Sequence, residues 1–146
     1  MGLDFYLYEN KSHNDVEIHK EYVIEEVLYL SNRTAMIIVN WLYRLKGDKL
    51  MDNYDESSHY VEITGEEIYD IILSLEKVQS TEYPFKNLLA YHLFPVLYPV
   101  VDVNTVEMWS DEYYGILDDL LIEFKKLYPS NDISNRERLF YYNIRW

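Results

Sequence analysis

The chain has 146 residues, with 26 acidic against 13 basic residues, a formal net charge of −13 and no cysteine. A single domain is expected at this length, and the lack of cysteine excludes a disulfide scaffold, a thiolate metal site and a cysteine nucleophile. Because phosphate contacts require Lys or Arg, we expect no direct binding to nucleic acid or to an anionic membrane.

The N-terminal part predicts strands and one helix. Residues 3–8 suit a pleated surface and predict a strand. Residues 16–30 mix acidic and apolar side chains and are compatible with a strand or with a poorly defined helix. Residues 32–46 predict a helix, because apolar residues recur at three- and four-residue steps between a cap at Ser31 or Asn32 and a stop at Gly47.

The clearest local signal follows a short alternating strand at residues 59–63. Residues 64–67 read Thr-Gly-Glu-Glu, which fits a capping box. In this motif the Thr64 hydroxyl accepts from the Glu67 amide and the Glu67 carboxylate accepts from the Thr64 amide. Apolar residues at helical spacing extend the expected helix to residue 78.

The C-terminal half is divided by prolines. Residues 79–86 predict a loop, and residues 88–103 predict a short helical turn followed by a buried extended segment, because Pro95 and Pro99 are too close for one helix. A helix capped at Ser110 or Asp111 is expected to run to residue 127. Aromatic and β-branched residues at 139–146 predict a final strand.

Together these elements predict one acidic α+β domain over residues 1–146. The expected architecture is a small antiparallel sheet, which includes the N-terminal and C-terminal strands, packed against about three helices. Those helices are near residues 32–46, 65–78 and 111–127.

No motif for catalysis or metal binding is present. No two of the four histidines are spaced i, i+4, the glycines are isolated, and no serine is in a Gly-x-Ser-x-Gly context. We therefore expect a protein that is not an enzyme, with no catalytic residue, metal or cofactor. Of the histidines, His92 is expected to be half-buried beside Phe94.

The acidic residues are unevenly distributed. Residues 51–76 contain eight acids and residues 87–124 contain seven, and neither segment contains Lys or Arg. Such segments either keep the protein soluble or form a field that a basic partner recognises. Tyrosines expected to be exposed between the acids (Tyr54, Tyr60, Tyr69, Tyr113 and Tyr114) favour binding, because tyrosine is enriched at interfaces. The candidate binding residues are Asp52, Asp55, Glu56, Glu66, Glu67, Asp70, Asp111, Glu112, Tyr113 and Tyr114.

Several stretches resemble a largely uncharacterised family of small phage and prophage proteins that begin Met-Gly-Leu-Asp-Met-Tyr-Leu. Residues 1–7 read Met-Gly-Leu-Asp-Phe-Tyr-Leu, residues 40–42 Asn-Trp-Leu, residues 111–114 Asp-Glu-Tyr-Tyr and residues 140–146 Phe-Tyr-Tyr-Asn-Ile-Arg-Trp. The chain departs from the family pattern at Phe5 and lacks an aromatic, Gly-rich stretch before Asp111. The resemblance implies an origin in a mobile genetic element of a bacterium and supplies no catalytic residue.

These observations lead to a functional hypothesis. The first ten residues lack the features of a signal peptide, so we expect a cytoplasmic protein, and its expected partner is a basic host protein. The sharpest form is a counter-defence inhibitor, such as an anti-CRISPR, whose carboxylates mimic phosphates in a nuclease or another nucleic-acid-binding defence protein. The alternatives are a self-associating immunity-type or structural accessory protein, and a small enzyme acting on a cationic or nucleotide substrate.

Overall fold

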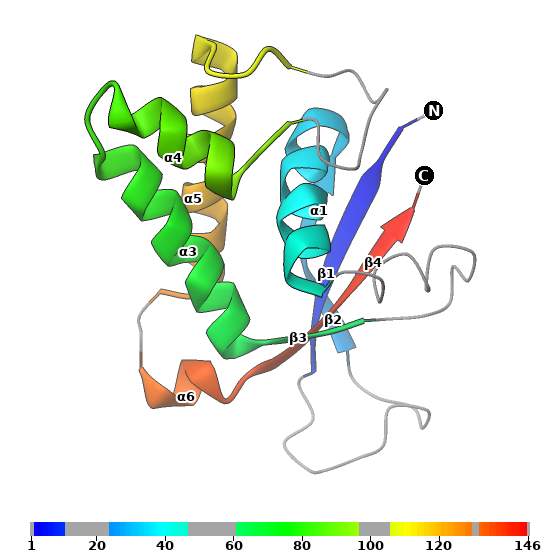
Figure 1. Cartoon of the computed structure of the whole chain (residues 1–146). Coiled ribbons are helices and arrows are strands. Elements are labelled where there is room, and N and C mark those ends of the chain that lie inside the picture. The colour runs from blue at the N-terminus through cyan, green and yellow to red at the C-terminus, as the bar shows by residue number, and fades with distance from the viewer. Residues whose placement is uncertain (1, 11–23, 47–60, 97–105, 130–131, 146) are drawn as a thin grey trace.

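A computed structural model describes residues 2–10, 24–46, 61–96, 106–129 and 132–145 (Figure 1). These residues form an α+β structure, as the sequence predicts. The elements in chain order are β1 (Asp4–Asn10), β2 (Ile24–Ser31), α1 (Asn32–Lys46), β3 (Val61–Thr64), α3 (Gly65–Ser80), α4 (Phe85–Leu93), α5 (Asp111–Leu127), α6 (Ile133–Arg136) and β4 (Leu139–Arg145). None of these helices is long and apolar enough to cross a bilayer.

The four strands form one antiparallel sheet in the order β2-β1-β4-β3. Near the start of β1, Phe5 is paired with Leu30 of β2 on one side and with Ile144 of β4 on the other. The prediction that the N-terminal and C-terminal strands pair is therefore confirmed. Of the two structures left open for residues 16–30, the strand is the one that residues 24–30 adopt; residues 16–23 lie outside the described part of the chain.

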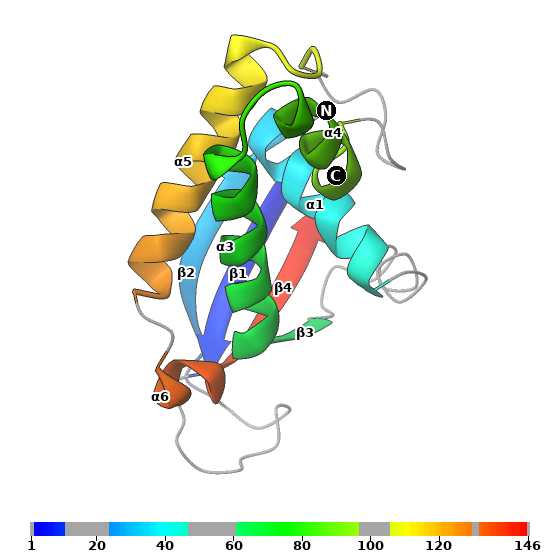
Figure 2. The ribbon, with the colours of Figure 1, turned by 60° about the vertical axis from the view of Figure 1, so that its left-hand side comes forward.

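Helices α1, α3 and α5 cover one face of this sheet (Figure 2). Alternation along β1 directs Leu3, Phe5 and Leu7 toward that face, where all three are buried. The helices α1, α3 and α5 match the three predicted ones. The capping box on α3 is also confirmed, since both of its hydrogen bonds are present.

Two further helices are present: one is longer than the helical turn predicted there, and the other was not predicted. The segment from Phe85 to Leu93 forms the nine-residue helix α4 rather than part of a loop and a short turn, because Pro95 ends a helix but Pro84, just before its first residue, does not interrupt it. The four-residue α6 precedes β4. The extended segment predicted after α4 falls largely on residues 97–103, outside the described residues.

A partly buried ion pair joins β1 to Arg138, the residue before β4. Glu9 continues the inward-facing side of β1, and both of its carboxylate oxygens accept from Arg138 at 2.7 Å. Arg138 also donates to the Leu127 carbonyl at 2.8 Å, which is at the end of α5. The hydrogen bonds from Arg138 to Glu9 raise the pKa of Arg138. Together with the bond to Leu127, they connect the C-terminal end of α5 to β1.

Candidate protein-interaction surfaces

The first acidic cluster is at the start of α3, and one of its members is committed to the fold. The Thr64 hydroxyl accepts from the Glu67 amide at 3.1 Å, and the Glu67 carboxylate accepts from the Thr64 amide at 3.0 Å. Lys46 at the end of α1 pairs with the same carboxylate at 2.8 Å. Burial raises the pKa of Glu67, but the hydrogen bonds from Lys46 and Thr64 outweigh it and hold this pKa below its ordinary value.

Glu66 and Asp70 are exposed beside it, and neither forms an ion pair with a described residue. Burial raises the pKa of Asp70, and the charges of Glu66 and Glu67 raise it further. The three carboxylates therefore repel one another, as like charges at neighbouring helical positions do. Tyr69, expected to be exposed among them, is half-buried and stacks on Tyr128 with ring centroids 5.8 Å apart.

The second acidic cluster is at the start of α5. Ser110 caps this helix by accepting from the Tyr113 amide at 3.1 Å, as one of the two predicted caps. Glu112 forms an ion pair with Arg33 of α1. Asp111 is exposed and has no ion-pair partner among the described residues.

The expectation that Tyr113 is exposed is wrong. Its exposed fraction is 0%, and its hydroxyl donates to the Phe94 carbonyl at 2.8 Å. Burial raises the pKa of this phenol well above its usual value. The sequence contains the signal that places it, since Tyr113 stands four residues before Leu117 and seven before Leu120, on the buried stripe of α5.

Tyr114 is half-buried and joins α5 to α4. Its hydroxyl donates to the Asn87 side chain, and the Lys86 ammonium lies 5.0 Å from the centre of its ring. The ring of Tyr83 meets it edge-on at a centroid distance of 6.2 Å. Burial raises the pKa of Tyr114, with a smaller contribution from Tyr83. The first turns of α5 and the N-terminal half of α4 therefore form one continuous surface.

The structure does not bring the predicted binding residues together. Helices α3 and α5 are antiparallel neighbours, linked by Gln79 to Asp118 at 3.3 Å and by Lys125 to Glu76 at 3.2 Å. Their two acidic starts therefore lie at opposite ends of the helical layer (Figure 2). The remaining candidates, Asp52, Asp55 and Glu56, lie outside the described residues.

A surface that was not predicted from the sequence lies on α4, the residues just before it and the turn before α5. We call it the α4 apolar surface. It consists of five large exposed side chains, with these exposed fractions: Tyr83 63%, Phe85 67%, Leu88 66%, Tyr91 63% and Trp109 43%. Within α4 only Ala90 is buried. A dense apolar composition in a helix too short to bury it is the sequence signal for this surface.

Contacts between rings show that the α4 apolar surface extends to the turn before α5. Tyr91 and Trp109 have ring centroids 6.3 Å apart. Trp109 has a positive φ of 67°, which is strained for a bulky residue and is a conformation enriched at functional sites. His92, expected to be half-buried, is exposed next to Tyr91.

Within the described residues, no group of three or more His, Asp or Glu side chains is placed to hold a metal ion. A scan against protein-family models, a search of curated proteins and a search of solved structures each gave no match to this chain.

Proposed function

We propose that this protein acts by binding a basic protein, and that the α4 apolar surface and the acids beside it make the contact. The observation that carries the proposal is the exposure of five large side chains on α4, just before it and in the turn before α5. Contiguous apolar patches on a soluble protein mark interaction sites, and aromatic residues supply much of the energy at such sites.

The charge around this surface indicates the kind of partner. Glu82, Glu107 and Asp111 are exposed in the segments that adjoin α4. Asp111 lies three residues before Tyr114, which contacts α4, and so is on the same side of α5. With a net charge of −13 on the whole chain, approach of a basic surface is accelerated and approach of an acidic one is opposed.

The narrower hypothesis is that the partner is a nuclease or another nucleic-acid-binding defence protein of a bacterial host. Its support is the acidity of the chain and the resemblance of its termini to phage proteins. Self-association is the second candidate, because the α4 apolar surface would also be covered in a dimer. The net charge of −13 opposes it, since two copies repel each other.

The test is affinity capture from a bacterial lysate with matched variants. The double variant Leu88→Ser with Tyr91→Ser removes two exposed apolar groups, and Asp111→Asn removes a charge. The control is Ile122→Ser, since Ile122 is 53% exposed on α5 but belongs to neither acidic cluster nor the α4 apolar surface. We expect the double variant to lose at least about tenfold in capture, and the control to retain it.

Salt and nucleic acid refine the outcome. Asp111→Asn should slow association and weaken its dependence on ionic strength, because it removes one charge that attracts the partner. Competition by DNA or RNA for the captured protein would support phosphate mimicry. Equal capture by all variants would refute the proposal, and a concentration-dependent dimer lost in the double variant would favour self-association.

A further inference from the structure

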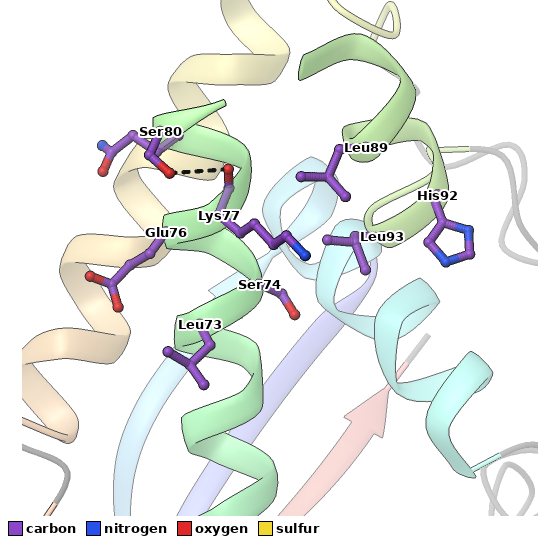
Figure 3. A pocket seen from close by; sticks show the side chains of 9 residues that line it. Leu73, Ser74, Glu76, Lys77, Ser80, Leu89, His92 and Leu93 are labelled. Carbon is purple, nitrogen blue, oxygen red and sulfur yellow. Dashed lines mark hydrogen bonds between the residues drawn. The ribbon is translucent and has the colours of Figure 1, made fainter. Parts of the chain in front are cut away.

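A second contact feature lies on the other edge of α4, where a groove of about 910 Å³ separates α4 from the C-terminal half of α3. Leu73 of α3 and Leu89 and Leu93 of α4 give it apolar walls. Figure 3 shows Lys77 extended from α3 across the groove toward Leu93, while Glu76, which also lines the groove, points away from Leu93.

The lysine in this groove differs from the other described lysines. Lys46, Lys125 and Lys126 pair with carboxylates at 2.8, 3.2 and 3.2 Å, and Lys86 lies over two tyrosine rings. Lys77 has neither kind of partner among the described residues. Its neighbour Glu76 pairs with Lys125 instead. Lys77 is exposed in the groove beside Leu93, so its ammonium can pair at short range with a carboxylate of a bound segment, although the net charge of the chain opposes acidic surfaces at long range.

We infer that this groove binds an amphipathic helix of a partner protein, with apolar side chains against the leucines and an Asp or Glu carboxylate paired with Lys77. An amphipathic helix binds by laying its apolar face into a hydrophobic groove, and the groove between α3 and α4 has three leucines along its walls. Ser74 and His92 at the groove edges supply further hydrogen-bonding groups.

This inference goes beyond the proposed function and does not depend on it. The α4 apolar surface adjoins acids and attracts a basic partner, whereas the groove carries a cation and selects an acidic residue within an apolar segment. The two features are on different edges of the same helix and can be changed separately.

The experiment selects helical peptides from a yeast-displayed random library with the full-length protein as bait. We expect enriched peptides to carry apolar residues at i, i+3 and i+4 together with one Asp or Glu. One enriched peptide is then synthesised, labelled and titrated by fluorescence polarisation. Lys77→Gln should weaken its binding about threefold to fivefold, the scale of an exposed ion pair.

A double-mutant cycle assigns the contact. Replacing the acid of the peptide by its amide should weaken binding to the wild type by the same factor, but should have no effect on Lys77→Gln. Leu73→Ser should also weaken binding, because Leu73 is an exposed part of the apolar wall. Lys126→Gln is the matched control, since it makes the same change in charge on α5, where Lys126 pairs with Glu123.

Several results would overturn the inference. The first is a library selection that enriches no helical pattern. The second is a peptide that binds equally well to the wild type, to Lys77→Gln and to Leu73→Ser, and the third is a proline-containing peptide that binds as well as the helical one. Binding that requires a dimer of the protein would assign the groove to a second copy. Asp111→Asn should bind the peptide normally, so loss of the groove and loss of the proposed basic partner can be told apart.

Discussion

Helices α3 and α5 begin in the same way and are used differently. Each has a hydroxyl cap, Thr64 or Ser110, that accepts from the amide three residues later. Each has two acids in its first turn, which the helix dipole favours. The third residue after the cap differs: it is Glu67 in α3 and Tyr113 in α5.

The third residue after the cap determines which contacts hold each helix start in place. Glu67 bonds back to its own cap and to Lys46, so the start of α3 is fixed by polar contacts at the edge of the sheet. Tyr113 is buried beneath the end of α4, where its hydroxyl reaches Phe94. The start of α5 is therefore fixed by an aromatic anchor, and α4 is held above it with its apolar side chains exposed.

The largest expected effect is the difference in stability between a variant that lacks the buried Tyr113 side chain and one that lacks the exposed Tyr91 side chain. Tyr113→Ala should destabilise the domain by about 3–5 kcal/mol, the usual cost of deleting a fully buried aromatic side chain. Tyr91→Ala should change the free energy of unfolding by less than about 0.5 kcal/mol, because Tyr91 is 63% exposed. Urea unfolding of both variants measures the contrast, and equal values would remove the distinction between anchor and contact residue.

Two glycines give the next contrast. A Cβ on Gly65 would lie 2.3 Å from the Asn135 carbonyl oxygen and 2.8 Å from that of Arg136, whereas a Cβ on Gly115 would meet nothing within 4 Å. Gly65→Ala should therefore cost about 1–3 kcal/mol, because α6 backbone must move away. Gly115→Ala should stabilise by about 0.5–1 kcal/mol, because Gly115 is exposed inside α5 and alanine is the better helix former. Thermal melts that shift in the same direction would contradict this.

Local signals in the sequence were sufficient for much of the fold. A capping box depends on four consecutive residues, and helix α5 depends on repeated spacing between Leu117, Leu120 and Phe124, so both can be predicted without tertiary information. The two terminal strands could be paired because their aromatic, alternating residues needed a common sheet.

Exposure depends on tertiary packing, and the charge of neighbouring residues does not predict it. Tyr113 follows two acids but belongs to the buried stripe of its helix. Phe85 and Leu88 are as apolar as core residues, yet α4 packs against the core with Leu89, Ala90 and Leu93, which leaves Phe85 and Leu88 in solvent. Which carboxylates are paired also depends on distant residues, since Glu112 meets Arg33 and Glu67 meets Lys46.

The cap of α3 should contribute on a smaller scale. Thr64→Ala should destabilise by about 1 kcal/mol, since it leaves the Glu67 amide without its acceptor. Thr64→Ser should restore most of this loss, because a serine hydroxyl makes the same hydrogen bond. Ser110→Ala is the matching change in α5. If the burial of Tyr113 alone fixes the start of α5, Ser110→Ala should destabilise the domain by less than Thr64→Ala does. Equal melting of the Thr64→Ala and Thr64→Ser proteins would show that Thr64 is not the cap.

Glu67 should make the free energy of unfolding depend on pH in the acidic range. Its pKa is lower in the folded protein than its ordinary value of 4.5, so the folded state resists protonation. The stabilising contribution is then complete above pH 4.5 and is lost as the pH falls through the lower folded pKa. Glu67→Gln should be less stable than wild type at pH 7, and the difference should shrink toward pH 3. Parallel stability curves for the two proteins would contradict this role.

The smallest change in the free energy of unfolding should come from removing one carboxylate near each helix start, and it should have opposite signs for Asp70→Asn in α3 and Asp111→Asn in α5. Burial and the charges of Glu66 and Glu67 raise the pKa of Asp70 above its ordinary value of 3.8, so its ionised form is disfavoured in the folded protein. Asp70→Asn should therefore stabilise the domain by a few tenths of a kcal/mol at pH 7, about the size of one like-charge pair on a helix. This gain should disappear as the pH falls below 3.8, where Asp70 is protonated in both states.

At the start of α5 the same change has a different physical setting. Asp111 is the first residue of its helix, where a negative charge interacts favourably with the helix dipole. Asp111→Asn should therefore destabilise by about 0.3–1 kcal/mol at low salt, and the effect should weaken as salt screens it. Denaturant unfolding of both variants at two ionic strengths measures the signs. If both variants were stabilised, repulsion between carboxylates would outweigh the helix dipole at both helix starts. The acids beside the α4 apolar surface would then repel one another as those of α3 do, and a basic partner would relieve that repulsion on binding.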